Sequence, residues 1–145
     1  MQIIKPWLLL MAALGLSGSA LAQQSMQAGP YEIHYNAFTS DRLAPEVASA
    51  YGIRRAGNQA ILNITVLKRD SKEPVRAWLS AAATNLTGQR REIEMREISD
   101  QGAIYYLGQF RINDEETLDF EVLVVPEGHA GPPYEVSFRQ QFFTP

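Results

Sequence analysis

Few side chains in this sequence are suited to metal chemistry. The nitrogen and sulfur ligands on offer are His34, His129, Met26 and Met95, and there is no cysteine. Metal sites usually draw on closely spaced ligands, such as a pair at i, i+4 on a helix. Neither histidine has such a neighbour, so the sequence predicts no metal site and no cofactor. It does not show whether His34 and His129 come together.

Hydrolytic chemistry has no better support. A serine nucleophile needs a base and an orienting acid, and the G-x-S-x-G elbow is absent. Carboxylate pairs occur at Glu92/Glu94 and at Glu115-Glu116, where an exposed strand face and a turn explain them. The lack of cysteine also excludes thiol catalysis and disulfides. Because no constellation meets the first requirements of an active site, we expect that the protein is not an enzyme.

The first 22 residues have the three parts of an export signal. Lys5 provides the positive start, residues 7–16 are apolar, and residues 20–22 read A-x-A, which predicts cleavage before Gln23. A spanning helix needs ~20 apolar residues, and this run is shorter. We therefore expect a periplasmic protein that keeps no membrane span after signal cleavage.

The remaining chain fits one domain. Removing 22 of the 145 residues leaves 123, which suits a single core without disulfides. We place the domain at residues 30–145, after a flexible N-terminus at residues 23–29. Without Lys5 there are 12 basic and 16 acidic residues, a net charge of −4. This mild acidity argues against a nucleic-acid partner.

Alternating apolar and polar residues predict about seven strands. They fall at residues 30–36, 60–67, 75–83, 92–98, 104–111, 118–125 and 134–143, with turn residues between them. This spacing is typical of two packed antiparallel sheets, so we predict an all-β, immunoglobulin-like β-sandwich. Residues 60–67 are apolar on both sides, as for a central strand. Periodicity does not give the strand order.

One short helix is predicted after the first strand. Pro45 suits a first helical position and Gly52 suits the C-terminal stop. Ala44 has no capping side chain, so two turns of helix must be held by packing against the sheets. Three residues at i, i+4 and i+8 form the face that would pack: Leu43, Val47 and Tyr51.

The predicted binding site surrounds this helix. A strand interrupted by a helix leaves a sheet edge or end, which the helix can cap or turn into one side of a groove for a partner. Capping the end of the sandwich is favoured, because the apolar face must be buried in either case. The residues predicted to contact a partner are His34, Asn36, Arg42 and Tyr51.

The run "YNAFTSDRLAPEVASAYGI", followed by "NQAILNITVL", resembles a proteobacterial family of small exported proteins catalogued as a domain of unknown function. The most specific part is P-E-V-A-x-A-Y-G-I at residues 45–53, then Asn58 and residues 62–64. The family pattern has Thr or Ser where this chain has Ala44, which bears on helix capping. The resemblance implies a Gram-negative periplasmic protein and implies no activity.

These observations predict a non-enzymatic periplasmic binding or assembly module that recognises a protein partner or another envelope component. An exposed apolar patch or an open edge beside residues 45–51 would indicate such a module. The alternative is a small-molecule or metal carrier of the periplasm. A carrier would need a pocket converging on His34 or His129.

Overall fold

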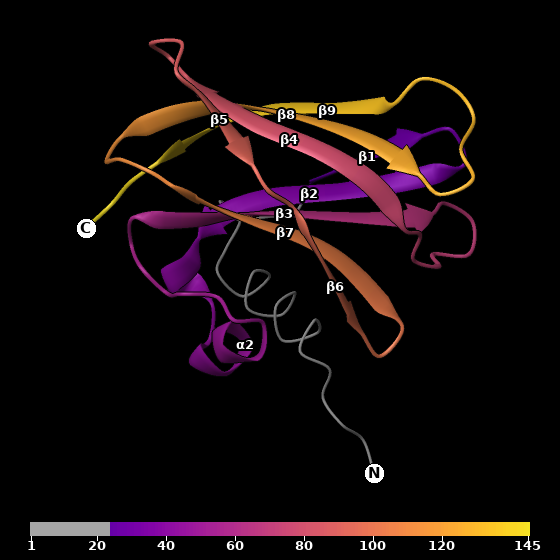
Figure 1. Ribbon diagram of the computed structural model, residues 1–145, viewed down its shortest axis with the longest axis horizontal. Coiled ribbons are helices and arrows are strands. Elements are labelled where there is room, and N and C mark those ends of the chain that lie inside the picture. Colours follow the sequence, from indigo (N-terminus) through magenta and orange to yellow (C-terminus); the bar gives the residue numbers. More distant parts are fainter. Residues whose placement is uncertain (1–23) are drawn as a thin grey trace.

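The computed structural model describes residues 24–145, so the predicted signal peptide lies outside the described residues. Two antiparallel sheets pack face to face over this range (Figure 1). The described residues form nine strands, a short 3-10 helix and one α-helix: β1 (Gln24–Ala28), β2 (Tyr31–Thr39), η2 (Ser40–Arg42), α2 (Pro45–Ala50), β3 (Gln59–Lys68), β4 (Ala77–Asn85), β5 (Arg90–Ile93), β6 (Arg96–Asp100), β7 (Ala103–Arg111), β8 (Glu116–Pro126) and β9 (Tyr134–Phe142).

The strand order is that of an immunoglobulin-like sandwich. Sheet A has five strands in the order β1-β2-β3-β7-β6, and sheet B has four in the order β5-β4-β8-β9. Strands β2, β3, β7 and β6 correspond to the A-B-E-D sheet of a constant-type domain, and β4, β8 and β9 to its C-F-G sheet. The predicted all-β, immunoglobulin-like sandwich is confirmed, with more strands than the seven expected.

The flexible N-terminus predicted at residues 23–29 is wrong. Residues 24–28 form β1, which pairs with β2 from Gln24 opposite Tyr35 to Ala28 opposite Tyr31. Gly29, with φ of 56°, turns the chain between the two strands. The segment is polar because it is an edge strand. Main-chain hydrogen bonds to β2 order it, and composition does not reveal them.

The strand predicted at residues 92–98 is two strands in different sheets. β5 pairs with β4 in sheet B, and β6 pairs with β7 in sheet A. The connection passes so close to β7 that a Cβ atom on Gly108 would lie 2.5 Å from Ile93 Cγ2 and 3.0 Å from the Glu94 carbonyl oxygen. The absence of a side chain at Gly108 therefore makes room for this close approach.

Gly108→Ala is expected to destabilise the protein by about 1–3 kcal/mol, the usual cost of overpacking. The measurement is urea denaturation of the variant and the wild type. The matched test adds Ile93→Ala, which removes the nearest carbon. If the close approach is the cause, the double variant loses less than the sum of the two single losses. Strict additivity would show that the crossing at Gly108 is not the source of the cost.

The main core lies between the sheets. Alternate residues of β3 are fully buried there: Ala60, Leu62, Ile64 and Val66. Phe120 of β8 stacks on Phe138 of β9 with ring centroids 4.6 Å apart. This packing explains one apolar side of β3 and leaves the other side to be explained.

A second core explains the other side of β3. Helix α2 lies against the outer face of sheet A (Figure 1), and the buried cluster there contains Phe38, Leu43, Val47, Ala48, Tyr51, Ile53, Ile61, Tyr105 and Leu107. The predicted burial of Leu43, Val47 and Tyr51 is confirmed. The sequence analysis favoured a helix that caps the end of the sandwich. The helix instead covers the outer face of sheet A. The chain leaves β2 and returns in the neighbouring β3, so the insert folds back over the sheet that both strands belong to.

No helix within residues 24–145 is both long enough and apolar enough to cross a membrane.

Candidate functional site

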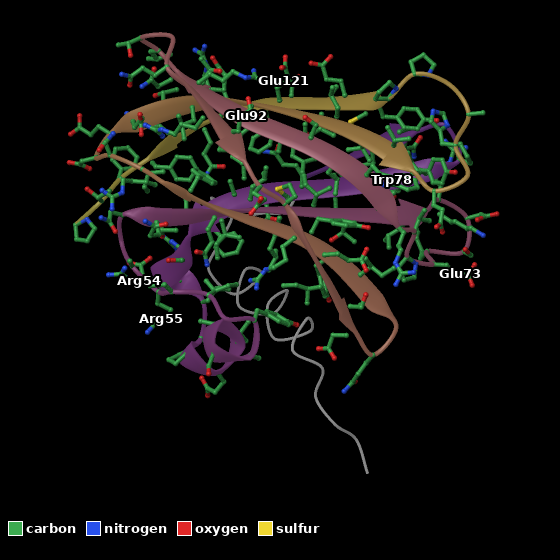
Figure 2. All side chains as sticks on the ribbon, in the orientation of Figure 1. Arg54, Arg55, Glu73, Trp78, Glu92 and Glu121 are labelled. Carbon is green, nitrogen blue, oxygen red and sulfur yellow. The ribbon has the colours of Figure 1, made fainter. Side chains whose placement is uncertain are left out.

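The insert between β2 and β3 is held by side chains that bind main-chain carbonyls. Ala44, before α2, makes no side-chain cap, as its type predicted. Three other side chains replace the cap by donating to carbonyl oxygens: Ser40 to Arg54 (2.8 Å), Arg55 to Leu43 (2.8 Å) and Arg96 to Tyr51 (2.6 Å). Figure 2 shows Arg55 beside helix α2. Sequence reasoning missed these residues because their partners are main-chain atoms brought close by the fold.

Tyr51 is a buried residue of the second core and not an open contact surface. Its hydroxyl donates to Asp100 Oδ2 at 3.4 Å. Burial, and then the Asp100 charge, raise the pKa of Tyr51 to about 12. Burial, followed by the charges of Tyr51 and Asp100, also raises the pKa of Tyr105. These shifts keep both phenols neutral at physiological pH, and Tyr51 packs as part of the second core.

His34 lies on the outer face of sheet A, in a small charged group. Its Nε2 is 3.0 Å from Glu32 Oε1, and Lys72 Nζ donates to the same carboxylate at 3.0 Å. The hydrogen bonds from Lys72 and then from His34 hold the pKa of Glu32 below its usual range. Because side chains alternate along a strand, Asn36 faces the same way as His34 and Glu32.

Asn36 and Asn63 form a buried carboxamide pair on this outer face. They are partners in the β2–β3 register, and Asn63 Nδ2 donates to Asn36 Oδ1 at 3.1 Å. Asn36 is 7% exposed and Asn63 is 0% exposed. Asn36 Nδ2 and Asn63 Oδ1 have no hydrogen-bond partner. Buried side-chain polar atoms are seldom left this way in native proteins.

The sequence carried one signal for this pair. Asn63 is a polar residue inside a mostly apolar strand, and Asn36 was already a predicted site residue. What the sequence could not supply is the register that sets Asn63 opposite Asn36. The structure thus groups His34 and Asn36 of the predicted site with Asn63, which had not been selected.

The remaining predicted residues lie elsewhere. Arg42 is exposed in η2. His129 packs its ring on Tyr134 with centroids 4.6 Å apart, and at 6.4 Å it meets the edge of Tyr31, which faces the side of β2 opposite to His34. The two histidines therefore lie on opposite sides of β2. Within residues 24–145, no three His, Cys, Asp or Glu side chains are grouped so that they could hold a metal ion.

The large exposed apolar side chains of the described region are not beside α2. They are Trp78, Leu86, Leu123 and Phe143. Trp78 and Leu123 lie on neighbouring strands of sheet B, and Figure 2 shows Trp78 away from the insert. None of these four side chains forms an apolar patch beside residues 45–51, which would have indicated a binding surface there. The unusual feature on this face is the polar Asn36–Asn63 pair.

Comparisons with known proteins agree with this fold. The sequence profile of a family described as "Domain of unknown function (DUF4426)" matches residues 25–145. The crystal structure of a DUF4426 family protein from Pseudomonas aeruginosa PAO1 is 36% identical, with a TM-score of 0.74, over 85% of this chain and 96% of that one. No curated protein matches.

More distant similarity extends to FetP of uropathogenic Escherichia coli strain F11. One structure, of FetP as isolated after recombinant expression in the periplasm, is 12% identical with a TM-score of 0.62, over 85% of this chain and 95% of that one. A copper-bound FetP variant is 10% identical with a TM-score of 0.59, over 85% and 96%. At these identities the similarity concerns the fold alone.

Proposed function

The chain belongs to the DUF4426 family of unknown function, and we propose that it is a non-enzymatic periplasmic module that binds a protein or another envelope component. The observation that carries the proposal is the buried Asn36–Asn63 pair with its two unused polar atoms. A buried group without a partner costs about 1–3 kcal/mol. A ligand that supplied the missing hydrogen bonds would recover that cost, so the pair is suited to recognition.

The surroundings of the pair support the same assignment. His34, with 26% of its side chain exposed, lies two residues from Asn36 on the same face of β2. The insert closes the other end of the face, since Phe38, two residues beyond Asn36, belongs to the second core. In this proposal His34, Asn36 and Asn63 contact the ligand, Tyr51 positions the insert, and Arg42 lies at the rim.

The periplasmic location and the lack of enzymatic activity are parts of the proposal. The export signal predicted at residues 1–22 supports the location, and FetP, of similar fold, was expressed in the periplasm. The carrier alternative takes its support from copper-bound FetP, which is similar in fold only. Here His34 and Glu32 are close, but Lys72 already occupies the carboxylate of Glu32. The binding module is therefore the function we favour.

Site-directed photo-crosslinking in the native host tests the proposed surface. A photoreactive amino acid at position 34 is expected to yield one dominant adduct with an envelope component, since His34 borders the unused polar atoms. The matched control carries the same probe at position 78, because Trp78 is exposed on sheet B, away from α2. No adduct from position 34, or the same adducts from both positions, would contradict a binding site on this face.

A further inference from the structure

We infer that the Asn36–Asn63 pair recognises the main chain of an extended peptide segment. The inference rests on the proposed function and names the class of ligand. It starts from the inventory of unused atoms, which are a donor group on Asn36 and an acceptor atom on Asn63. The 3.1 Å hydrogen bond between the two carboxamides keeps this donor and this acceptor close together.

The set of unused atoms, one donor group and one acceptor, is the same in either orientation of the hydrogen-bonded carboxamide pair. Rotating both planes by half a turn makes Asn36 the donor of the shared bond and Asn63 the acceptor. One N–H donor group and one carbonyl acceptor then remain unused, as before. The ligand must therefore offer one acceptor and one donor to neighbouring positions.

One residue of an extended chain offers this combination. In antiparallel sheets two facing residues exchange both N–H···O bonds, so the N–H and the C=O of one extended residue point to the same side. A single trans amide, such as the N-acetyl group of a cell-wall sugar, points its N–H and C=O in opposite directions across a rigid plane. It would satisfy one unused atom of the pair and leave the other without a partner.

The spacing along β2 matches the repeat of an extended peptide. His34 and Asn36 are two residues apart on one face, which is ~6.6–6.8 Å in a strand. The main-chain groups on one side of an extended peptide recur at every second residue, with the same repeat. A segment lying along β2 could thus place one residue on the Asn36–Asn63 pair and the main-chain groups two residues away near His34. Because Asn36 is 7% exposed and Asn63 is 0% exposed, binding in this proposal requires the groups that cover the pair to move aside.

The charges near the pair favour an uncharged partner group. Glu32 is the carboxylate on the same face of β2, and it already accepts hydrogen bonds from Lys72 and His34. Neutral carboxamides facing a neutral main chain need no counter-charge, whereas a carboxylate or ammonium would be desolvated without a partner. Main-chain hydrogen bonds would supply affinity, and neighbouring side chains would supply the preference for particular sequences.

The test uses peptides selected from a phage-displayed random library on the exported protein, each then synthesised with and without N-methylation at single residues. We expect titration with the parent peptide to shift the side-chain amide resonances of Asn36 and Asn63 in ¹⁵N NMR spectra. Methylation at one residue should weaken binding about tenfold or more, as expected for the loss of a well-formed hydrogen bond.

Variants of the pair provide the second arm. The double variant Asn36→Leu/Asn63→Leu should lose about tenfold or more in affinity without a lower melting temperature, because both polar partners are replaced by apolar groups of similar size. Asn58→Leu, at an exposed position, is the matched control and should bind as the wild type does. The NMR titration of the wild type decides the matter if the double variant does not fold.

The outcomes separate this inference from the proposed function. Peptides that leave both asparagine resonances unchanged, or that tolerate methylation at every residue, would overturn main-chain recognition. If soluble N-acetylglucosamine oligomers, which contain no peptide, shift these resonances and peptides do not, the binding face stands and the peptide assignment is wrong. If neither probe shifts them and position 34 gives no crosslink, both proposals fail.

Discussion

Tyr51→Ala is expected to lower the free energy of unfolding by ~3–5 kcal/mol, the usual cost of removing a large aromatic side chain from a core. Tyr51 is buried with Leu43 and Val47 of the insert and with Tyr105 of sheet A. The insert has only six α-helical residues and no side-chain cap, so it does not hold without this packing. Urea denaturation followed by tryptophan fluorescence measures the loss as a lower midpoint at unchanged slope.

Tyr51→Phe is the matched control. It keeps the ring and removes only the hydroxyl that donates to Asp100 at 3.4 Å, so it should cost no more than about 1 kcal/mol. An alanine variant as stable as the wild type would show that the second core does not stabilise the fold, and Tyr51 would then be free for a role in recognition. Equal losses in both variants would place the contribution in the hydroxyl and not in packing.

Local patterns predicted what depends on neighbours along the chain. The spacing of Leu43, Val47 and Tyr51 identified the buried face of the insert, and Ala44 identified the missing cap. The two apolar sides of residues 60–67 identified a central strand, and the structure gives the reason, since one side meets sheet B and the other meets α2. The two-residue and helical periods express burial directly, so these features follow from sequence.

Features that depend on distant pairing could not be predicted in the same way. Residues 92–98 pass from sheet B to sheet A where the chain lies close to Gly108, and nothing local in the sequence marks the change between β5 and β6. The candidate site also depends on distant pairing, because only the β2–β3 register places Asn63 opposite Asn36. Polar residues within apolar strands deserve selection as candidates even before their partners are known.

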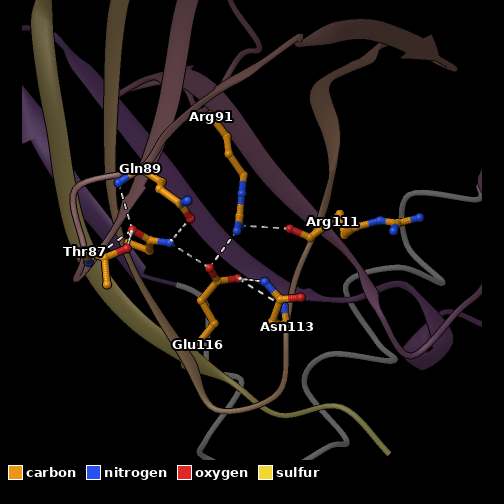
Figure 3. A network of polar contacts seen from close by, with 7 residues as sticks. Thr87, Gln89, Arg91, Arg111, Asn113 and Glu116 are labelled. Carbon is orange, nitrogen blue, oxygen red and sulfur yellow. Dashed lines mark hydrogen bonds and ion pairs between the residues drawn. The ribbon is translucent and has the colours of Figure 1, made fainter.

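The second large effect is expected at Glu116, whose carboxylate links the turn between β4 and β5 to the turn between β7 and β8 (Figure 3). Its carboxylate accepts a hydrogen bond from Arg91 at 2.6 Å, from Asn85 at 3.2 Å and from the main-chain N–H of Asn113 at 3.0 Å. Only 8% of the Glu116 side chain is exposed. Glu116→Ala should cost about 2–3 kcal/mol, less than the loss of a fully buried partner, because Arg91 keeps 26% exposure.

The pH dependence identifies the charge of Glu116 as the cause. Burial opposes ionisation, but the hydrogen bonds from Arg91, Asn113 and Asn85 outweigh it and hold the pKa of Glu116 below its usual range. A carboxyl group with a lowered folded pKa stabilises the protein above its unfolded pKa, about 4.3, and that contribution is lost as the pH falls through the folded pKa. Glu116→Gln keeps the size and an acceptor but cannot ionise. The stability gap between wild type and Glu116→Gln should therefore be full at neutral pH and should close as the pH falls below the unfolded pKa and through the lowered folded pKa. The exposed carboxylates are common to both proteins and cancel in the difference, so a gap that does not change with pH would mean that shape, and not charge, is what Glu116 contributes.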